Sequence, residues 1–409
     1  MLTTTPVLHG LASLQTLLGD PATSPHPGAR AIVAVDPALV GSAALGELTS
    51  MLAWCAIDHE IVTTPPIVDL DAVRSAAETL SRAAQVLTLG GGSTLDLVKI
   101  GLHLGAVPGL GDHLARCGRA GLIHLGDDAP NRPRHIAIPT TLGTGAERSP
   151  RACLSLDGHK RLLVGGGLAP DAAVLDERAT RDLPHHLVTY GAAEAFLRLA
   201  GVLTGDAAAW ADGLEDRLSL ELLAHTVEHA DRAAAADGPV PGDVRLALAK
   251  ASSWSQAPEF HRVGRDPFAA KGWYIANELS TATGATKVSA FGGVTAALWA
   301  RLQAGDLRLG SPQRLRLVWD RVRDASPGLP HAPADGLRVL LERWGVAPLD
   351  PMTTSQAEAV AAACDRRWGR GQPALGGFSR SELTDIVADA APDDSPSART
   401  VDLAVGAVS

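Results

Sequence analysis

The chain has 409 residues, of which 46% are hydrophobic but only 4% aromatic, so small and aliphatic side chains must supply the core. Such a core favours helices packed on helices or on a parallel sheet, and a chain of this length favours two domains. The formal net charge of −9 provides no chain-wide basic surface, which excludes general nucleic-acid binding.

The four cysteines are far apart and form no Cys-x-x-Cys pair, which argues against a zinc knuckle and a disulfide framework. The first residues contain no basic segment followed by a long apolar run, and no stretch of about 18 apolar residues occurs. We therefore expect a soluble, cytoplasmic protein without a secretion signal and without a membrane partner.

The first part of the chain alternates short apolar runs with helical patterns, one of which covers Asp71–Ala84. Strands are predicted at Ala29–Val35, Gln85–Leu89, His135–Ile138 and Ala172–Leu175. Short strands that are apolar along their whole length and separated by helices predict a doubly wound, parallel, Rossmann-like sheet in an α/β domain.

The second part has the 3.6-residue apolar spacing of helices and predicts an all-α domain. The predicted helices are Gly191–Leu203, Asp212–Glu228, Val244–Trp254, Lys271–Thr283 and Val294–Leu302. Aromatic residues change in density at the same place, since only Trp54 precedes Tyr190. We expect a dinucleotide-binding α/β domain in residues 1–180 and a helical domain in residues 181–409. The proline-rich segment Ala390–Thr400 is expected to be a loose linker.

The second predicted strand runs directly into Gly90, Gly91 and Gly92, which permit positive φ and close approach of a ligand to the backbone. Ser93 is expected to cap the following helix, with Asp96 as its partner in a capping box. Free N–H groups at the helix N-terminus then form a site for a phosphate or pyrophosphate. The alternative is a tight strand-to-helix turn, but the strand before and the helix after favour a nucleotide site.

A second glycine segment, Pro139–Glu147, follows the third predicted strand. Its candidate ligand-binding residues are Thr140, Thr141, Gly143 and Thr144. Because ligands bind open parallel sheets at the carboxyl ends of the strands, the two glycine segments are expected to complete one cleft. Asp36 ends the first predicted strand, where a carboxylate accepts hydrogen bonds from a ribose diol and repels a 2′-phosphate. The alternative for Asp36 is a turn cap before Pro37.

Together these motifs resemble the iron-containing alcohol dehydrogenase and dehydroquinate synthase superfamily. Its dehydrogenases carry GGGS-x-x-D-x-x-K, which Gly90–Lys99 matches, and PTT-x-GTGSE, which Pro139–Glu147 matches with Ala in place of Ser. The resemblance covers residues 5–300 and implies NAD bound between the two domains of a homodimer or larger homo-oligomer. The cofactor-binding residues that it implies are Asp36, Gly90, Gly91, Gly92, Ser93, Asp96, Lys99, Thr140, Thr141, Gly143 and Thr144.

Two alternatives remain open beside a dehydrogenase. Gly191–Glu194 resembles the Gly-x-Ala-Glu segment with which dehydroquinate synthases bind metal, and Lys160 lies where those sugar-phosphate cyclases have a substrate-binding lysine. The cofactor loops favour the dehydrogenases. The other alternative is a non-catalytic relative that binds a nucleotide or a partner protein as a scaffold.

Most members of the superfamily hold Fe²⁺ or Zn²⁺ with one carboxylate and two or three histidines. The resemblance places Glu194, Arg198, Asn277 and Phe291 at those positions, and other alignments place Ala193, Leu197 or Trp273 there. No histidine remains, aromatic rings of Phe and Trp do not ligate metals, and a guanidinium repels a cation. We therefore predict that the family metal is absent. The alternative is a rebuilt site that joins Glu194 to His185, His186 and His261.

Without a metal, hydride transfer still needs a general base and a group that stabilises an oxyanion. The candidate catalytic residues are Glu194, Arg198, Lys271, Tyr274 and Asn277, with Tyr190 beside them. Arg198 either clamps a substrate carboxylate or forms an i,i+4 ion pair with Glu194. Lys271, Tyr274 and Asn277 follow at steps of three residues and share one helical face.

The function predicted is an NAD-dependent oxidoreductase that oxidises a secondary alcohol of a small molecule or peptide in specialised metabolism. A substrate carboxylate would ease the loss of a metal, because the β-keto acid formed from a β-hydroxy acid loses CO₂ readily. The dehydrogenase of daptide-type ribosomal peptide pathways oxidises a C-terminal Thr in this way, with decarboxylation. The chain resembles that branch of the superfamily.

Overall fold

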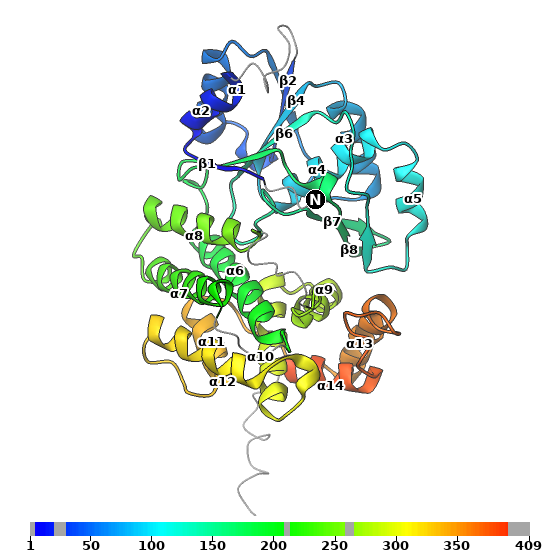
Figure 1. The fold of residues 1–409 in the computed structure, drawn as a ribbon, viewed down its shortest axis with the longest axis vertical. Coiled ribbons are helices and arrows are strands. Elements are labelled where there is room, and N and C mark those ends of the chain that lie inside the picture. Colours follow the sequence, from blue (N-terminus) through cyan, green and yellow to red (C-terminus); the bar gives the residue numbers. More distant parts are fainter. Residues whose placement is uncertain (1–4, 20–29, 208–212, 258–265, 392–409) are drawn as a thin grey trace, which may run out of the picture.

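The computed structural model describes residues 5–19, 30–207, 213–257 and 266–391 (Figure 1). Six parallel strands form the main sheet in the order β1-β9-β6-β4-β2-β3. They are β1 Val7–His9, β2 Ala31–Val35, β3 His59–Thr63, β4 Gln85–Gly90, β6 Arg134–Pro139 and β9 Ala172–Leu175. The four strands predicted from the sequence are β2, β4, β6 and β9, so the parallel α/β architecture is confirmed.

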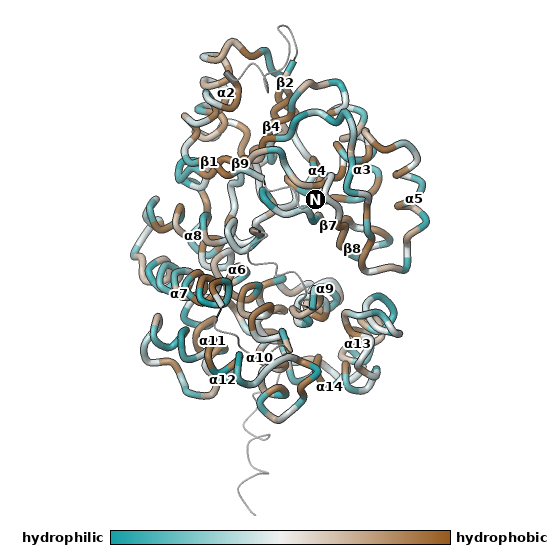
Figure 2. The backbone as a smooth tube through the Cα atoms, in the orientation of Figure 1, coloured by the Kyte–Doolittle hydropathy of each residue, from teal (hydrophilic) through white to brown (hydrophobic). Residues whose placement is uncertain are grey.

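The central strands β2 and β4 are buried at every residue, because helices cover both faces of the main sheet. The helical elements of this part are η1 Leu11–Ser13, α1 Leu14–Gly19, η2 Pro37–Leu39, α2 Ala43–Trp54, α3 Leu70–Leu80, α4 Gly92–Ala106, α5 Leu110–Arg116 and η3 Gly166–Leu168. On one face Val33 and Leu87 pack against η1, α1 and α2, and on the other Ile32 and Val86 pack against α3 and α4. Figure 2 shows β2 and β4 as hydrophobic segments.

A second sheet, which the sequence reading did not predict, has three strands in the order β5-β8-β7. Its strands are β5 Leu122–His124, β7 Arg151–Leu156 and β8 His159–Val164. β7 and β8 form an antiparallel hairpin whose turn residues, Asp157 and Gly158, have φ of 52° and 72°. Asp-Gly is a preferred pair for such a turn. Arg151 and Cys153 alternate along β7 with buried residues and therefore lie on the face of the hairpin away from the core beneath it.

The described chain beyond residue 184 is helical, which confirms the all-α character of the second part. Its elements are α6 His185–Gly205, α7 Leu214–Ala234, α8 Gly242–Trp254, α9 Lys271–Thr283, α10 Lys287–Gln303, η5 Leu307–Leu309, α11 Pro312–Ala325, α12 Pro333–Arg343, α13 Thr354–Trp368 and α14 Arg380–Ala390. All five predicted helices are present. Most of the predicted linker, from residue 392 onward, lies outside the described residues.

Helix α6 is the central helix of this part. By length and composition alone it is apolar enough to cross a membrane, but 67% of its most apolar window is buried inside the fold. Phe196 and Leu197 are fully buried in the core that α6 shares with α7, α10 and α11. The apolar character of α6 is therefore accounted for by packing against other helices.

Candidate functional site

The first glycine segment joins β4 to α4 at the carboxyl edge of the main sheet. Helix α4 begins at Gly92, and its N-cap is Gly91 without a side-chain cap. The prediction that Ser93 caps this helix in a box with Asp96 is therefore wrong. The helix starts two residues earlier than predicted because glycine tolerates the tight approach to the neighbouring threonines. Ser93 instead lies exposed in the first turn, beside the free backbone N–H groups.

The two glycine segments lie against each other, as predicted. The backbone N–H of Thr140 donates to the carbonyl oxygen of Gly90 at 3.0 Å. A Cβ atom added to Gly91 would lie 3.0 Å from Cγ2 of Thr141, and one added to Gly92 would lie 2.9 Å from Cγ2 of Thr144. The structure thus brings together a helix N-terminus, backbone free of side chains and two threonine hydroxyls, which are the elements of a phosphate site.

Asp36 stands at the end of β2, beside the first glycine segment. Its backbone N–H donates to the carbonyl oxygen of Leu89 at 3.1 Å. Its Oδ1 accepts from the N–H of Ala38 at 3.0 Å, so the turn-cap role is realised. Its Oδ2 makes no hydrogen bond to the described residues, which leaves it free for a ribose hydroxyl.

Asp96 and Lys99 face the interior. Asp96 Oδ2 accepts from the N–H of Cys153 at 2.9 Å, and Lys99 Nζ donates to the carbonyl oxygens of Ala146 and Arg151. Burial, opposed by Lys99, raises the pKa of Asp96, and burial lowers the pKa of Lys99. These two side chains connect α4 to the second glycine segment and to β7. They therefore fix the position of the N-terminal part of α4 relative to that segment.

Helix α6 meets the second glycine segment through Gly191 and Arg198. Gly143 has φ of 97°, and a Cβ atom on it would lie 2.5 Å from the carbonyl oxygen of Gly191. The Arg198 guanidinium donates to the carbonyl oxygens of Gly143 and Thr144, the latter at 3.1 Å. These contacts hold the Arg198 guanidinium on the backbone of this segment, while Glu194 and Arg198 still interact through their charges. The clamping of a substrate carboxylate by Arg198 stays a prediction.

Glu194 lies between Gly191 and Arg198 on the same face of α6. Its Oε1 is 3.1 Å from Nζ of Lys287, the first residue of α10. The same ammonium lies 5.2 Å from the centroid of the Trp273 ring. Burial would raise the pKa of Glu194, but the charges of Lys287 and Arg198 hold that pKa below its usual value. Glu194 and Lys287 thus form an ion pair at neutral pH.

The β7–β8 hairpin supplies further groups near this ion pair. Burial and the charge of Asp96 raise the pKa of Cys153 to about 11, with Lys287 and Lys160 opposing. Arg151 donates from Nη1 to Oε1 of Gln256 at 3.2 Å. Sequence reasoning missed Lys287, Cys153 and Arg151. The scarcity of lysine and the Asp-Gly turn of the hairpin were the available indications.

The other candidate catalytic residues contact different neighbours. Lys271 Nζ pairs with Oδ2 of Asp266 at 3.1 Å. Tyr274 packs on Trp368 with ring centroids 4.8 Å apart, and burial raises the pKa of its hydroxyl to about 12. Asn277 is buried and its Nδ2 lies 3.5 Å from the carbonyl oxygen of Lys160. The prediction that Lys271, Tyr274 and Asn277 act together is not supported by these contacts.

The residues at the family's metal positions do not fit a divalent cation. Glu194 is already paired with an ammonium, and the Arg198 guanidinium binds carbonyl oxygens. Phe291 is 1% exposed and lines a small apolar space between α6, α9 and α10. Ala193 and Leu197, from the other alignment, are fully buried. Among the described residues, no group of three or more His, Cys, Asp or Glu side chains is arranged to hold a metal ion.

The histidines proposed to rebuild a metal site do not approach Glu194. His185 and His186 open α6, about 12–14 Å along the helix axis from Glu194. His185 Nε2 lies 2.7 Å from the carbonyl oxygen of Ala233, and His186 packs edge-on against Tyr190. His261 lies outside the described residues.

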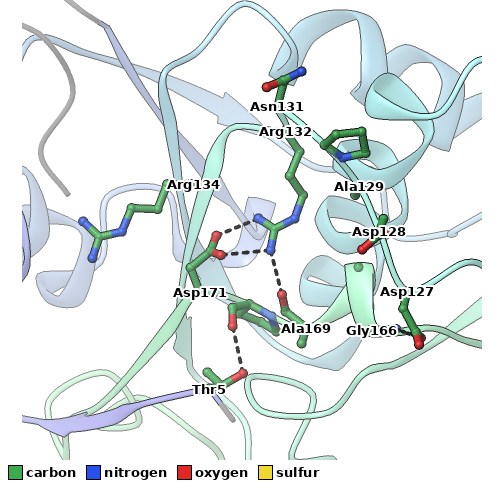
Figure 3. A pocket seen from close by; sticks show the side chains of 13 residues that line it. Thr5, Asp127, Asp128, Ala129, Asn131, Arg132, Arg134, Gly166, Ala169 and Asp171 are labelled. Atoms are coloured by element: carbon green, nitrogen blue, oxygen red, sulfur yellow. Dashed lines mark hydrogen bonds and ion pairs between the residues drawn. The ribbon is translucent and has the colours of Figure 1, made fainter. Parts of the chain in front are cut away.

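A separate open pocket of about 710 Å³ lies at the opposite edge of the sheet, before the amino ends of β6 and β9 (Figure 3). Arg132 spans it with a two-pronged contact to Asp171, at 2.6 Å and 3.1 Å. Asp171 also accepts from the N–H of His135 at 2.7 Å. Arg132 therefore has structural partners, and this edge is not where parallel sheets bind nucleotides.

Comparison with known proteins agrees with the motifs. The sequence profile described as iron-containing alcohol dehydrogenase matches residues 10–177. The bifunctional aldehyde-alcohol dehydrogenase of Escherichia coli K12 is 28% identical over 195 residues, which are 45% of this chain and 21% of that protein. Phosphonoacetaldehyde reductase of Streptomyces viridochromogenes is 30% identical over 196 residues, which are 46% of this chain and 47% of that protein. The chain thus spans less than half of these relatives.

Solved structures resemble the chain over nearly its whole length. NADH-dependent butanol dehydrogenase A of Thermotoga maritima has a TM-score of 0.76 at 14% identity, covering 96% of this chain and 98% of that one. Sulfoacetaldehyde reductase of Bifidobacterium kashiwanohense, solved with NAD⁺, has a TM-score of 0.71 at 16% identity, covering 96% and 99%. The chain therefore has the fold of these enzymes, and its residues 10–177 match the sequence profile of iron-containing alcohol dehydrogenase.

Proposed function

We propose that this protein is an NAD-dependent oxidoreductase that interconverts an alcohol and its carbonyl compound without the family metal. The contact between the two glycine segments at the N-terminus of α4 carries this proposal. Residues 1–180 would bind the nucleotide, with its phosphates at Gly91 and Gly92 and its ribose at Asp36. When bound, the nicotinamide accepts or supplies the hydride. The names of the relatives, which are alcohol dehydrogenases and aldehyde reductases, support the same reaction.

Calorimetry with NAD⁺ and NADP⁺ tests the nucleotide site. We expect NAD⁺ to bind and Gly92→Val to weaken it at least tenfold, about 1.4 kcal/mol, because the added side chain meets Thr144. Gly46→Val is the matched control, since a Cβ atom at that helical glycine meets nothing within 4 Å. Absence of NAD⁺ binding by the unmodified protein would refute the proposal.

The preference for NAD⁺ is proposed to rest on Asp36. Asp36→Ser removes the negative charge that opposes a 2′-phosphate while retaining a group able to cap the turn. We expect the ratio of the NADP⁺ to the NAD⁺ dissociation constant to fall at least tenfold. An unchanged ratio would assign Asp36 to the turn alone.

We further propose a substrate that carries an anionic group, such as a β-hydroxy acid or the C-terminal Thr of a peptide in specialised metabolism, with loss of CO₂ after oxidation. Lys287, Lys160 and Arg151 supply positive charge beside the expected reaction site. The names of the reductases for phosphonoacetaldehyde and sulfoacetaldehyde give two anionic aldehydes as precedents.

A panel of β-hydroxy acids, their neutral amides and a Thr-terminated peptide tests this substrate class, with NADH formation and CO₂ release as readouts. We expect turnover of the β-hydroxy acids and of the peptide, which carry a carboxylate, and no turnover of the neutral amides. Turnover of a sugar phosphate without net NADH would indicate the cyclase alternative, and nucleotide binding with no turnover of any substrate the scaffold alternative.

A further inference from the structure

We propose that Lys287 takes the place of the family's metal ion as the positive group that faces the substrate oxygen and exchanges a proton with it. This inference rests on the proposed function and names the residue that would replace the missing ion. It starts from the two side chains that hold the Lys287 ammonium, Glu194 and Trp273.

The resemblance places both partners of Lys287 at positions that ligate metal in the family. It gives Glu194 the carboxylate position, and an alignment with a short insertion gives Trp273 a histidine position. The ammonium lies 3.1 Å from Glu194 Oε1 and 5.2 Å from the centre of the Trp273 ring, so it sits between them. A carboxylate that would bind a metal ion here neutralises an ammonium, and the face of an indole ring attracts a cation.

The ion pair is partly open and lies beside the nucleotide segments. The side chain of Lys287 is 29% exposed and that of Glu194 is 17% exposed. Glu194 shares its helical face with Gly191 and Arg198, which contact the second glycine segment. The ammonium therefore has one carboxylate partner, further N–H donors to offer, and a place next to the site proposed for hydride transfer.

The chemistry follows from those free donors. In carbonyl reduction, Lys287 Nζ donates a hydrogen bond to the carbonyl oxygen. The bound NADH of the proposed function would supply the hydride of the new C–H bond and leave as NAD⁺. As the C=O π bond breaks, one N–H proton passes to the oxygen, leaving an alcohol and a neutral amine, and a proton taken up from solution restores the ammonium. Alcohol oxidation is the reverse, in which the minor fraction of Lys287 that is a neutral amine accepts the hydroxyl proton.

The surroundings keep the group positive. Burial would lower the pKa of Lys287, but the charge of Glu194 and the hydrogen bond that the ammonium donates to Glu194 raise it above its usual value, with Arg198 opposing. An ammonium that stays charged at neutral pH stabilises a developing alkoxide by charge, which is the task of a Lewis-acidic metal.

The test compares Lys287→Gln with Lys250→Gln, which changes a partly exposed lysine on α8. We expect kcat for the best β-keto or β-hydroxy substrate to fall about 10²–10³-fold in Lys287→Gln and to stay within twofold in Lys250→Gln. NADH affinity should be unchanged in both variants. Methylamine should restore part of the activity of Lys287→Ala and none of that of Lys250→Ala. If Lys287→Gln is poorly folded, Lys287→Arg keeps the cation but should remain at least tenfold slower.

A second readout needs no turnover. Competitive acetylation with mass spectrometry reports how much of each lysine is a neutral amine, and the chain has only five lysines: Lys99, Lys160, Lys250, Lys271 and Lys287. We expect Lys287 to be acetylated more slowly than Lys250 at pH 9. Glu194→Gln should accelerate the labelling of Lys287 several-fold, because the ammonium loses its carboxylate partner.

Two results would overturn the inference: full activity of Lys287→Gln, or activity of the native protein that is lost with a chelator and restored by Fe²⁺ or Zn²⁺. Either result would leave an NAD-dependent oxidoreductase in place. Failure of the native protein to bind NADH would instead overturn the proposed function beneath it.

Discussion

At the scale of single residues, the site depends on side chains whose partners are far away in the sequence. The sequence of α6 alone predicts that Arg198 clamps a substrate carboxylate or pairs with Glu194. In the fold its guanidinium holds the carbonyl oxygens of Gly143 and Thr144 and contacts Oγ of Ser255 at 3.0 Å. Its charge therefore orders the backbone of the second glycine segment.

We predict that Arg198→Gln weakens NAD⁺ binding about tenfold and lowers the free energy of unfolding by about 1.5–3 kcal/mol, the usual value of hydrogen bonds to a charged group. Calorimetry and urea unfolding measure the two effects. Arg301→Gln, which removes a partly exposed surface cation that pairs with Asp389, serves as the control and should change neither quantity appreciably.

Cys153 permits a test of the electrostatics of the hairpin. Burial and Asp96 raise its pKa to about 11, so at pH 8 only about one thiol in a thousand is the reactive thiolate. We predict that iodoacetamide at pH 8 leaves Cys153 unlabelled in the folded protein, and that the rate rises about tenfold for each pH unit up to pH 10. Rapid labelling at pH 8 would contradict this description of its surroundings.

At the scale of elements, the contact between Gly143 and Gly191 decides how closely α6 approaches the nucleotide segment. Two glycines facing each other allow backbone-to-backbone contact that any side chain would prevent. The sequence pattern identified a flexible segment at Gly143 but not its partner, because the two glycines belong to elements 48 residues apart.

We predict that Gly143→Ala lowers stability by about 2–4 kcal/mol, from the strain of positive φ together with the clash on Gly191. Gly109→Ala is the matched control, since Gly109 has φ of 77° but nothing within 4 Å of an added Cβ atom. Denaturant unfolding of both variants separates the cost of positive φ from the cost of the clash with Gly191. Equal losses would show that the approach of α6 contributes little.

At the scale of the whole molecule, the end of the chain packs back onto its first half. Glu278 of α9 is 2% exposed and accepts from Nη1 of Arg367 and Nε1 of Trp368, each at 2.9 Å. The ring of Trp368 in turn covers Gly121, where an added Cβ atom would lie 2.6 Å from it. The small sheet is thereby joined to α9 and α13.

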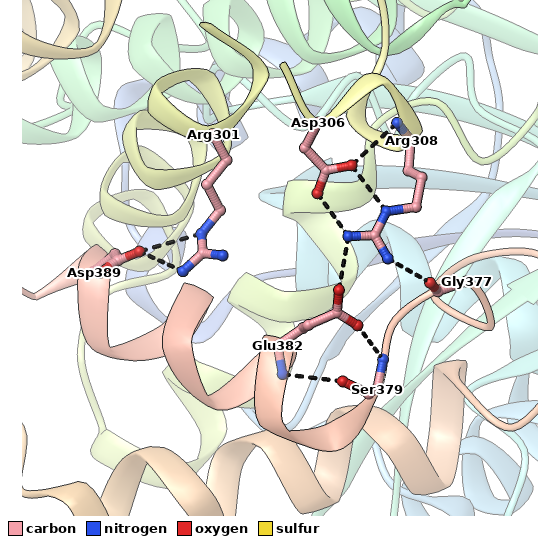
Figure 4. Close-up of polar contacts among 7 residues, drawn as sticks. All are labelled: Arg301, Asp306, Arg308, Gly377, Ser379, Glu382 and Asp389. Atoms are coloured by element: carbon pink, nitrogen blue, oxygen red, sulfur yellow. Dashed lines mark hydrogen bonds and ion pairs between the residues drawn. The ribbon is translucent and has the colours of Figure 1, made fainter. Parts of the chain in front are cut away.

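We predict that Glu278→Ala destabilises the protein by about 3–5 kcal/mol, because Arg367 would remain buried without its carboxylate. Asp389→Ala removes the partner of Arg301 in the exposed polar contacts of Figure 4 and should cost at most about 1 kcal/mol. Thermal unfolding of the two variants tests the difference. A smaller loss for Glu278→Ala would mean that water reaches Arg367.

The sequence predicted the central strands and the long helices because their apolar patterns are local. It missed the edge strand β3, most of whose residues are exposed, and the hairpin β7–β8, although Asp157-Gly158 marks its turn. It located the glycine segments but missed Lys287, because the partner of Glu194 lies 93 residues further along the chain. Contacts of that kind depend on how the elements pack and not on any local pattern.

The contact between the small sheet and α13 also bears on the order in which the chain folds. The N–H of Gly121, just before β5, donates to the carbonyl oxygen of Arg367 at 3.3 Å. On the ribosome the parallel sheet can form once β9 has emerged. The α13 residues that cover Gly121 are made only when synthesis is almost finished. Nascent chains that stop before residue 368 should therefore expose the surface around Gly121 to chaperones.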